Sequence, residues 1–219
     1  MTMTRWDKKK GAADEPRRVT VKRGESGQTT ALFACALSAI LICLAFAVDL
    51  GLANFDRTRT SDQVQQSLSE ATLPATSLLV KNSATPGEEM TRALAESLRR
   101  EGFTGSIEAY YYEPDITATR KDVRVYVFGI NVECETKALF GRLLGTDGVP
   151  TRVLSWAHAI PYSSYETYKP ATPANGVLRV GAGDDVSAGA WTPVTDMSEY
   201  MMPGVSVEVE RAVAEALAL

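Results

Sequence analysis

The longest hydrophobic pattern in the chain is an apolar run near its N-terminus. Residues 31–48 contain no charged side chain, and Asp49 follows them directly. As a helix, the window 31–53 would be about 34 Å long, enough to cross the roughly 30 Å hydrocarbon core of a bilayer. The pattern therefore predicts a transmembrane helix over residues 31–53.

Two other interpretations of this run stay open at the level of sequence. A cleaved signal peptide usually has a shorter apolar core, although Ala45-Phe46-Ala47 resembles a cleavage site. A buried helix of a soluble protein would show a polar stripe, whereas Ser38 is the one interruption here. The pattern favours a permanent anchor.

Helical patterns continue beyond the apolar run. Residues 54–73 repeat apolar side chains at helical spacing, and Pro74 should end or kink this helix. A second helix is expected from the capping residue Thr85 to Gly102. Its apolar face consists of Met90, Leu94 and Leu98.

Strand patterns occupy the middle of the chain, over residues 106–113, 122–134 and 151–160. The second of them has apolar residues on both faces, which predicts a strand covered on both sides. A short helix is expected at 136–144. The order of elements predicts an α+β fold, with a long N-terminal helix that continues into a stalk and then a small antiparallel sheet with packed helices.

These patterns divide the chain into five predicted segments. They are a basic cytoplasmic leader (1–30), a transmembrane helix (31–53), an extracytoplasmic stalk helix and linker (54–82), a small α+β domain (83–165), and a loop-rich tail (166–219). The tail contains many Gly and Pro residues, with a short strand pattern at 177–180 and a helical pattern in 205–219. We expect this tail to be only partly ordered.

Charge gives the predicted helix an orientation. The 219 residues carry a net charge of −4, but residues 1–30 alone hold eight basic and four acidic side chains. Arg57 and Arg59 are the basic residues that follow the span closely. The positive-inside rule therefore places the leader in the cytoplasm and residues 54–219 outside the membrane. The net charge of −4 argues against nucleic acid as a partner of the whole chain.

The sequence offers little for catalysis or metal binding. Cys35 and Cys43 lie in the apolar run, so the remaining Cys134 and His158 are too few for a four-ligand Cys/His zinc site within one domain unless carboxylates contribute. The chain lacks the Gly-x-Ser-x-Gly turn of serine hydrolases. His158 shares a strand face with Trp156, so we interpret it as a packed or surface side chain. No catalytic residue, cofactor or metal site is predicted.

Small residues recur every fourth position through the apolar run. Positions four apart lie nearly above one another on a helix, which predicts a small face that allows another membrane helix to approach closely. An equally simple interpretation is that Ala-rich anchors show such rows by chance. Asp49 is expected to mark the outer end of the span, where its carboxylate can reach water. The predicted packing residues are Ala31, Cys35, Ala39, Cys43, Ala47 and Gly51.

Residues 23–71 resemble the N-terminal region of TadE/TadG-like proteins, which are membrane components of the bacterial tight-adherence (Flp) pilus system. The resemblance rests on Arg23-Gly24-Glu25-Ser26-Gly27-Gln28, the apolar run, the step Val48-Asp49-Leu50-Gly51, and the polar helix after it. It implies a minor pilin or assembly protein whose partners are the bilayer and other pilus or secretion membrane proteins. A homo- or hetero-oligomer formed through the transmembrane helix is part of this expectation.

The resemblance has a departure at the candidate processing sites, Gly24 and Gly27. Pilin-like members carry Glu five residues after the cleaved Gly, whereas this chain has Thr29 and Leu32 at those positions. The departure favours the uncleaved, TadG-like form.

Two rival functions remain. One is a membrane-anchored extracytoplasmic binding or sensor module unrelated to pili. The other is a secreted enzyme released by cleavage after Ala47.

Overall fold

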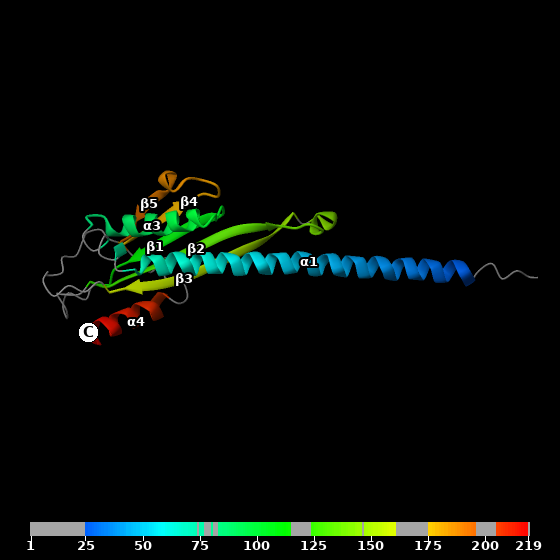
Figure 1. Ribbon diagram of the computed structural model, residues 1–219, viewed down its shortest axis with the longest axis horizontal. Coiled ribbons are helices and arrows are strands. Elements are labelled where there is room, and N and C mark those ends of the chain that lie inside the picture. Colours follow the sequence, from blue (N-terminus) through cyan, green and yellow to red (C-terminus); the bar gives the residue numbers. More distant parts are fainter. Residues whose placement is uncertain are drawn as a thin grey trace, which may run out of the picture. The chain divides into compact units, whose positions relative to one another are not determined.

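The computed structural model describes residues 25–73, 75–76, 80, 83–114, 124–145, 147–160, 175–195 and 205–218. The predicted leader residues 1–24, including Gly24, lie outside the described residues. Two compact units make up the chain, residues 1–44 and 45–219. The first described element, α1 (Glu25–Ala71), is a 47-residue helix that belongs to both (Figure 1).

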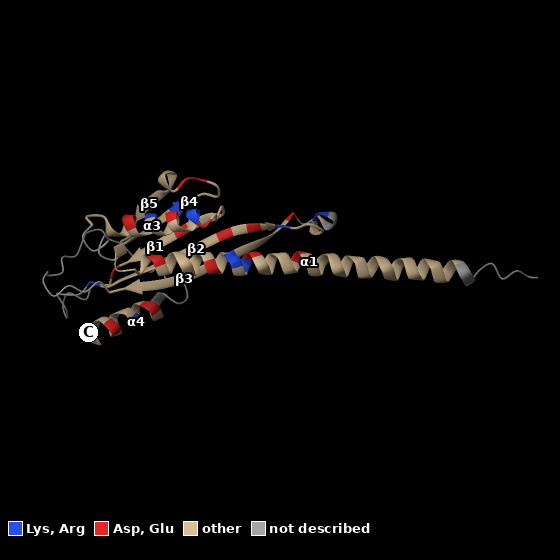
Figure 2. Ribbon diagram, in the orientation of Figure 1, with Lys and Arg blue, Asp and Glu red and all other residues tan. Residues whose placement is uncertain are grey.

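The two parts of α1 have different surroundings. Among the described residues, one helix, over Gly27–Ala71, is long and apolar enough to cross a membrane. Its large apolar side chains before Asp49 are exposed, with Leu32 at 69% and Phe46 at 54%. Lys, Arg, Asp and Glu are absent from residues 27–48 and return from Asp49 onward (Figure 2). Val64 and Leu68, by contrast, are buried against the sheet.

The second predicted helix is confirmed as α3 (Pro86–Arg100). Its predicted face of Met90, Leu94 and Leu98 is fully buried. Acidic residues lie in its first turn and Arg99 and Arg100 in its last, as the helix dipole favours. Thr85 does occupy the N-cap position, but among the described residues its side chain makes no capping hydrogen bond.

The described strands form one antiparallel sheet with the order β3-β2-β1-β4-β5 (Figure 1). The strands are β1 (Ser106–Tyr112), β2 (Tyr126–Lys137), β3 (Gly148–Ala159), β4 (Gly176–Val180) and β5 (Ala190–Pro193). Two 3-10 turns, η1 (Gly141–Leu144) and η2 (Val186–Ala188), follow β2 and β4. The last helix is α4 (Val205–Ala218). The predicted α+β class is confirmed.

The sheet is larger than the sequence predicts. Residues 136–144 do not form the expected short helix, because β2 and β3 stay paired as far as Lys137 and Gly148. Only η1 remains of that helix, and Gly145 ends it with φ 82°, a left-handed conformation that glycine adopts readily. The predicted tail contributes β4, β5 and α4, and β4 pairs with the central strand β1.

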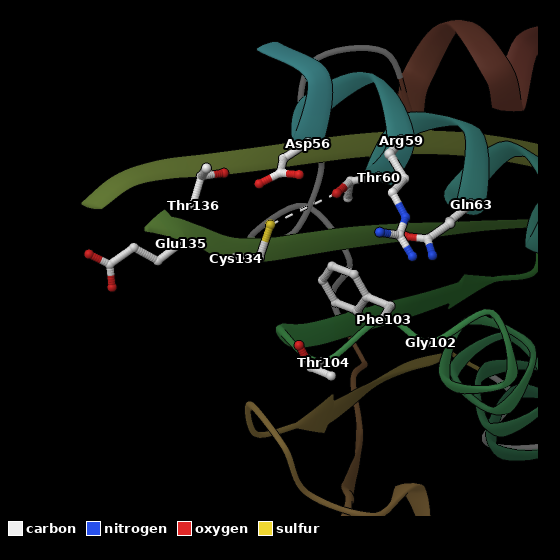
Figure 3. Close-up of a pocket in the computed structure, with 10 residues that line it drawn as sticks. All are labelled: Asp56, Arg59, Thr60, Gln63, Gly102, Phe103, Thr104, Cys134, Glu135 and Thr136. Carbon is white, nitrogen blue, oxygen red and sulfur yellow. Dashed lines mark hydrogen bonds between the residues drawn. The ribbon is translucent and has the colours of Figure 1, made fainter. Parts of the chain in front are cut away.

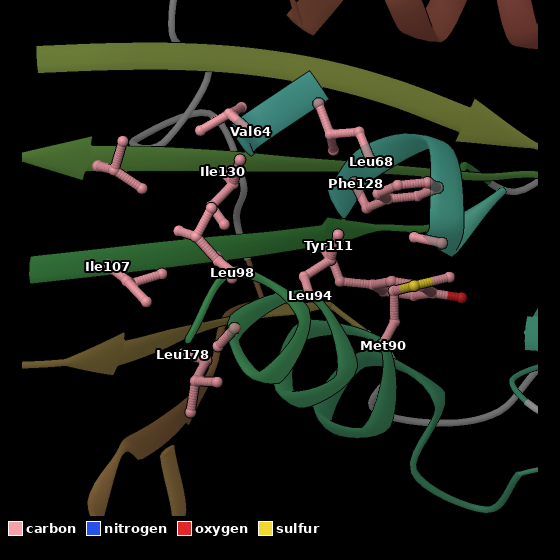
Figure 4. Packing of buried hydrophobic residues seen from close by; sticks show 14 of the residues in the cluster. Val64, Leu68, Met90, Leu94, Leu98, Ile107, Tyr111, Phe128, Ile130 and Leu178 are labelled. Atoms are coloured by element: carbon pink, nitrogen blue, oxygen red, sulfur yellow. The ribbon is translucent and has the colours of Figure 1, made fainter. Parts of the chain in front are cut away.

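The core lies between the sheet and two helices (Figure 4). Residues from α1, α3 and the sheet form one buried cluster that includes Val64, Leu98, Tyr111 and Phe128. A smaller cluster on α4 joins Ala212 and Ala216 to Val125 and Val127. Residues 124–132 are buried throughout, so the prediction of a doubly covered second strand is confirmed. The core cluster thus combines parts of the predicted segments 54–82, 83–165 and 166–219.

Candidate functional site

A carboxylate on α1 binds the backbone of the loop that leaves β2. Asp49 Oδ1 accepts the N–H of Leu139 at 2.9 Å, and Asp49 Oδ2 accepts the N–H of Gly141 at 2.6 Å. The N–H of Phe140 lies 3.2 Å from Oδ1 and 3.1 Å from Oδ2. Three consecutive backbone donors therefore converge on one side chain. We call this contact the Asp49 clasp.

Asp49 is buried in the clasp, whereas the sequence predicted a carboxylate that reaches water. Asp49 is 9% exposed, whereas its neighbours Val48 and Leu50 are 46% and 56% exposed. The residue ends the apolar run, but it does not end a helix, since α1 continues to Ala71. A carboxylate that accepts several N–H groups retains hydrogen bonds in place of those it would make to water. Its charge can thus be accommodated beside an apolar run.

The predicted small residues Ala31, Cys35, Ala39, Cys43, Ala47 and Gly51 are all exposed on α1, and so is Gly27. They do not share one face over the whole run. At 3.6 residues per turn, a step of four residues advances about 400°, so the row drifts by about 40° at each step. A smaller set stays within about 80° around the helix axis and can form one patch against a partner helix: Ala39, Cys43 and Ala47. Such a drifting row suits a crossing partner helix rather than a parallel one.

A polar pocket of about 180 Å³ lies beside the second half of α1 (Figure 3). Asp56 and Arg59 bring opposite charges to it, and Cys134 comes from β2. The Cys134 thiol lies 3.9 Å from Thr60 Oγ1, and Gln63 Nε2 donates to the Glu101 carbonyl at 2.7 Å. The described residues contain no group of three or more His, Cys, Asp or Glu side chains that could hold a metal. The pocket offers hydrogen bonds to a small polar molecule.

A ladder of polar side chains crosses four strands of the sheet. Glu108 on β1 accepts from Tyr110 Oη at 2.7 Å, from Arg179 Nε at 3.0 Å and from Asn131 Nδ2 at 3.1 Å. Arg152 on β3 extends the ladder by donating to Asn131 Oδ1 at 2.9 Å. Burial on its own raises the pKa of Glu108, but these hydrogen bonds outweigh it and lower that pKa. Burial, with the Glu108 charge, raises the pKa of the Tyr110 hydroxyl.

His158 links the sheet to α4. Its Nδ1 lies 2.6 Å from Glu208 Oε1, and its Nε2 lies 3.0 Å from Glu215 Oε2. Trp156 packs on the same side of the sheet, against the α4 cluster. The structure therefore gives His158 a packing role, and its partners could not be identified from the sequence because they lie 50 and 57 residues away.

The chain matches no protein-family model, no curated protein and no solved structure. The fold and the contacts described above are thus the basis on which a function is argued.

Proposed function

We propose that this chain is a non-enzymatic, single-pass membrane component of a bacterial pilus or secretion apparatus, similar to TadE/TadG-like minor pilins or assembly proteins. The observation that supports it best is α1. One helix carries an exposed apolar run and then enters the core of a folded sheet domain through Val64 and Leu68. An exposed apolar run of this length is stable in lipid rather than in water.

In this proposal the leader faces the cytoplasm and the sheet domain lies outside the membrane. The basic side chains of residues 1–30 set this orientation. The domain then acts through protein contacts, and α1 acts through packing against partner helices. No cofactor is needed for either role.

The patch of Ala39, Cys43 and Ala47 is the proposed helix contact. Replacing all three residues by Leu should weaken association with partner helices, because larger side chains keep the backbones apart. Ala34, Ser38 and Ala45 lie on the opposite side of the helix at about 100° per residue. Their replacement by Leu is a matched control, since both variants remain long enough and apolar enough to insert.

Crosslinking in host membranes, followed by recovery of the chain, tests this proposal. Recovery of pilus or secretion proteins with the wild type and the control, but not with the patch variant, is the expected result. Equal crosslinking by all three proteins would remove the packing hypothesis. Recovery of other proteins, without pilus or secretion components, would favour the second candidate.

The second candidate is a membrane-anchored binding or sensor module. The polar pocket between α1 and β2 is the observation that favours it. Asp56 and Arg59 would be the recognition groups for a small polar ligand. In that case a change at these residues would alter ligand response and leave crosslinking between membrane helices unchanged.

The N-terminus of the native protein separates the remaining alternatives. Mass spectrometry of host membranes should find a chain that begins at or near Met1 if the anchor is permanent. A chain that begins at Glu25 or Gln28 would indicate pilin-like processing and a subunit of the fibre. A chain that begins just after Ala47 would indicate a secreted protein, and the proposed function would fail.

A further inference from the structure

The loop held by Asp49 exposes apolar side chains. Leu139 is 61% exposed and Phe140 is 41% exposed, although the same two residues donate their backbone N–H groups to Asp49. Elsewhere in this part of the chain, apolar residues of the sheet such as Ile130 and Val132 are fully buried. Leu139 and Phe140 therefore lie where the sheet domain does not cover them.

The clasp joins this loop to the residue that directly follows the apolar run. Asp49 directly follows Val48, the last residue of the run, and each N···O distance in the clasp is 3.2 Å or less. The backbone of residues 139–141 is therefore within hydrogen-bond reach of the helix at the point where the apolar run stops. If the run spans a bilayer, that point is its water interface.

Basic side chains flank the two apolar residues. Lys137 and Arg142 are both exposed, on either side of Leu139 and Phe140. Apolar side chains beside Lys or Arg are typical of segments that lie at a membrane surface, where the cation reaches lipid phosphates and the apolar group enters the acyl boundary. Asp147 is also exposed in this connection, and its carbonyl accepts the N–H of Ala138.

We infer that the loop between β2 and β3 is a second membrane contact, in which Leu139 and Phe140 enter the lipid interface and Asp49 holds the loop at that depth. This inference rests on the membrane anchor of the proposed function. It adds a partner for the sheet domain, the lipid surface itself. The domain would then be attached at two points, through α1 and through the loop. Two points of attachment would fix its orientation relative to the bilayer surface.

The experiment places one fluorophore at a time on the full chain in phosphatidylcholine/phosphatidylglycerol vesicles. Cys35, Cys43 and Cys134 are first replaced by Ala, so that each labelled variant has one thiol. The labelled positions are Leu139→Cys in the loop, Leu41→Cys in the apolar run and Leu73→Cys beyond the end of α1. Leu73 is a matched control because it is an exposed leucine, at 54%, about 33 Å or more along the helix from Asp49.

Quenching by brominated acyl chains reports contact with lipid. Strong quenching at 41 and 139, and severalfold weaker quenching at 73, is the expected result. Quenching at 41 with a value at 139 equal to that at 73 would overturn the inference and leave the anchor intact. Weak quenching at all three positions would overturn the anchor, and the inference with it.

Asp49→Asn tests the positioning role of the carboxylate. The amide keeps one acceptor oxygen and replaces the other by an NH₂ group, which cannot accept the Gly141 N–H. Quenching at 139 should fall while quenching at 41 stays unchanged. Unchanged quenching at both positions would show that Asp49 does not hold the loop.

Discussion

Arg124 and Glu113 form a bidentate ion pair inside the protein. Arg124 Nε lies 2.8 Å from Glu113 Oε1, and Arg124 Nη2 lies 2.8 Å from Glu113 Oε2. Their side chains are 2% and 6% exposed. The pair spans the connection between β1 and β2, and the Glu113 N–H also donates to Asn175 Oδ1 at 2.8 Å, just before β4.

Breaking this pair should destabilise the sheet domain strongly. Glu113→Ala leaves the Arg124 guanidinium buried without its carboxylate, and such changes cost about 3–5 kcal/mol. Urea unfolding of the full chain in detergent measures the loss. Glu96→Ala, an exposed change on α3, should alter the unfolding free energy by less than about 0.5 kcal/mol. Similar small values for both variants would contradict the burial argument.

Gly129 should not tolerate a side chain. A Cβ at this position would lie 2.2 Å from Trp156 Cε3, on the neighbouring strand, so the indole would have to move. Gly129→Ala should lower the unfolding free energy by about 1–3 kcal/mol, the usual cost of overpacking. Gly27→Ala is the matched control, because a Cβ there meets nothing within 4 Å. Indole fluorescence during unfolding would follow both variants, and an unaltered midpoint for Gly129→Ala would refute the clash.

The polar ladder makes stability depend on pH through Glu108. Hydrogen bonds lower its pKa in the folded protein below the ordinary value of 4.5. The contribution of the ionised Glu108 side chain to folding stability is therefore complete above pH 4.5 and is lost as the pH falls through the lowered folded pKa. Urea midpoints measured from neutral to acidic pH should fall less steeply in Glu108→Gln than in the wild type. In Arg179→Gln, which removes one of the donors, the folded pKa of Glu108 should lie closer to its ordinary value, so the loss of stability should be smaller and should be complete at a higher pH. If the urea midpoints of all three proteins fell in parallel with pH, Glu108 would not be the source of the pH dependence.

Docking of α4 should depend on His158. His158→Ala removes both contacts with α4, from Glu208 and Glu215, each worth about 1 kcal/mol for a typical hydrogen bond. Amide hydrogen exchange in residues 205–218 should become faster while that of β1 stays unchanged. Arg211→Gln, which removes only an exposed pair with Glu208, provides the comparison. Exchange in α4 that is no faster in His158→Ala than in this comparison would show that apolar packing alone holds the helix.

The parts of the fold with strong local periodicity could be predicted. Met90, Leu94 and Leu98 define the buried face of α3 by spacing alone, and the apolar residues of β2 lie on both faces of the strand. β5 has only four residues and carries no alternating apolar pattern, so its pairing with β4 depends on tertiary context. The helix expected at 136–144 has a local apolar pattern, but the continued pairing of β2 with β3 prevails there.

The Asp49 clasp could not be predicted, for a different reason. Its donors are backbone N–H groups 90 to 92 residues away, and backbone groups have no signature in the sequence. Asp49 itself was identified from its position after the apolar run. The partner of the carboxylate could be found only once the topology placed the β2–β3 connection beside α1.

The order of the sheet has a consequence for the newly made chain. β1 pairs with β2, which follows it closely, but its other neighbour is β4, where Ile107 meets Val180 and Tyr110 meets Val177. During synthesis, one edge of β1 therefore stays unpaired until residues 176–180 have emerged from the ribosome. An unpaired apolar edge of this kind attracts other strands. Nascent chains of this protein thus pass through a stage that is prone to aggregation, and protein truncated before residue 176 would remain in it.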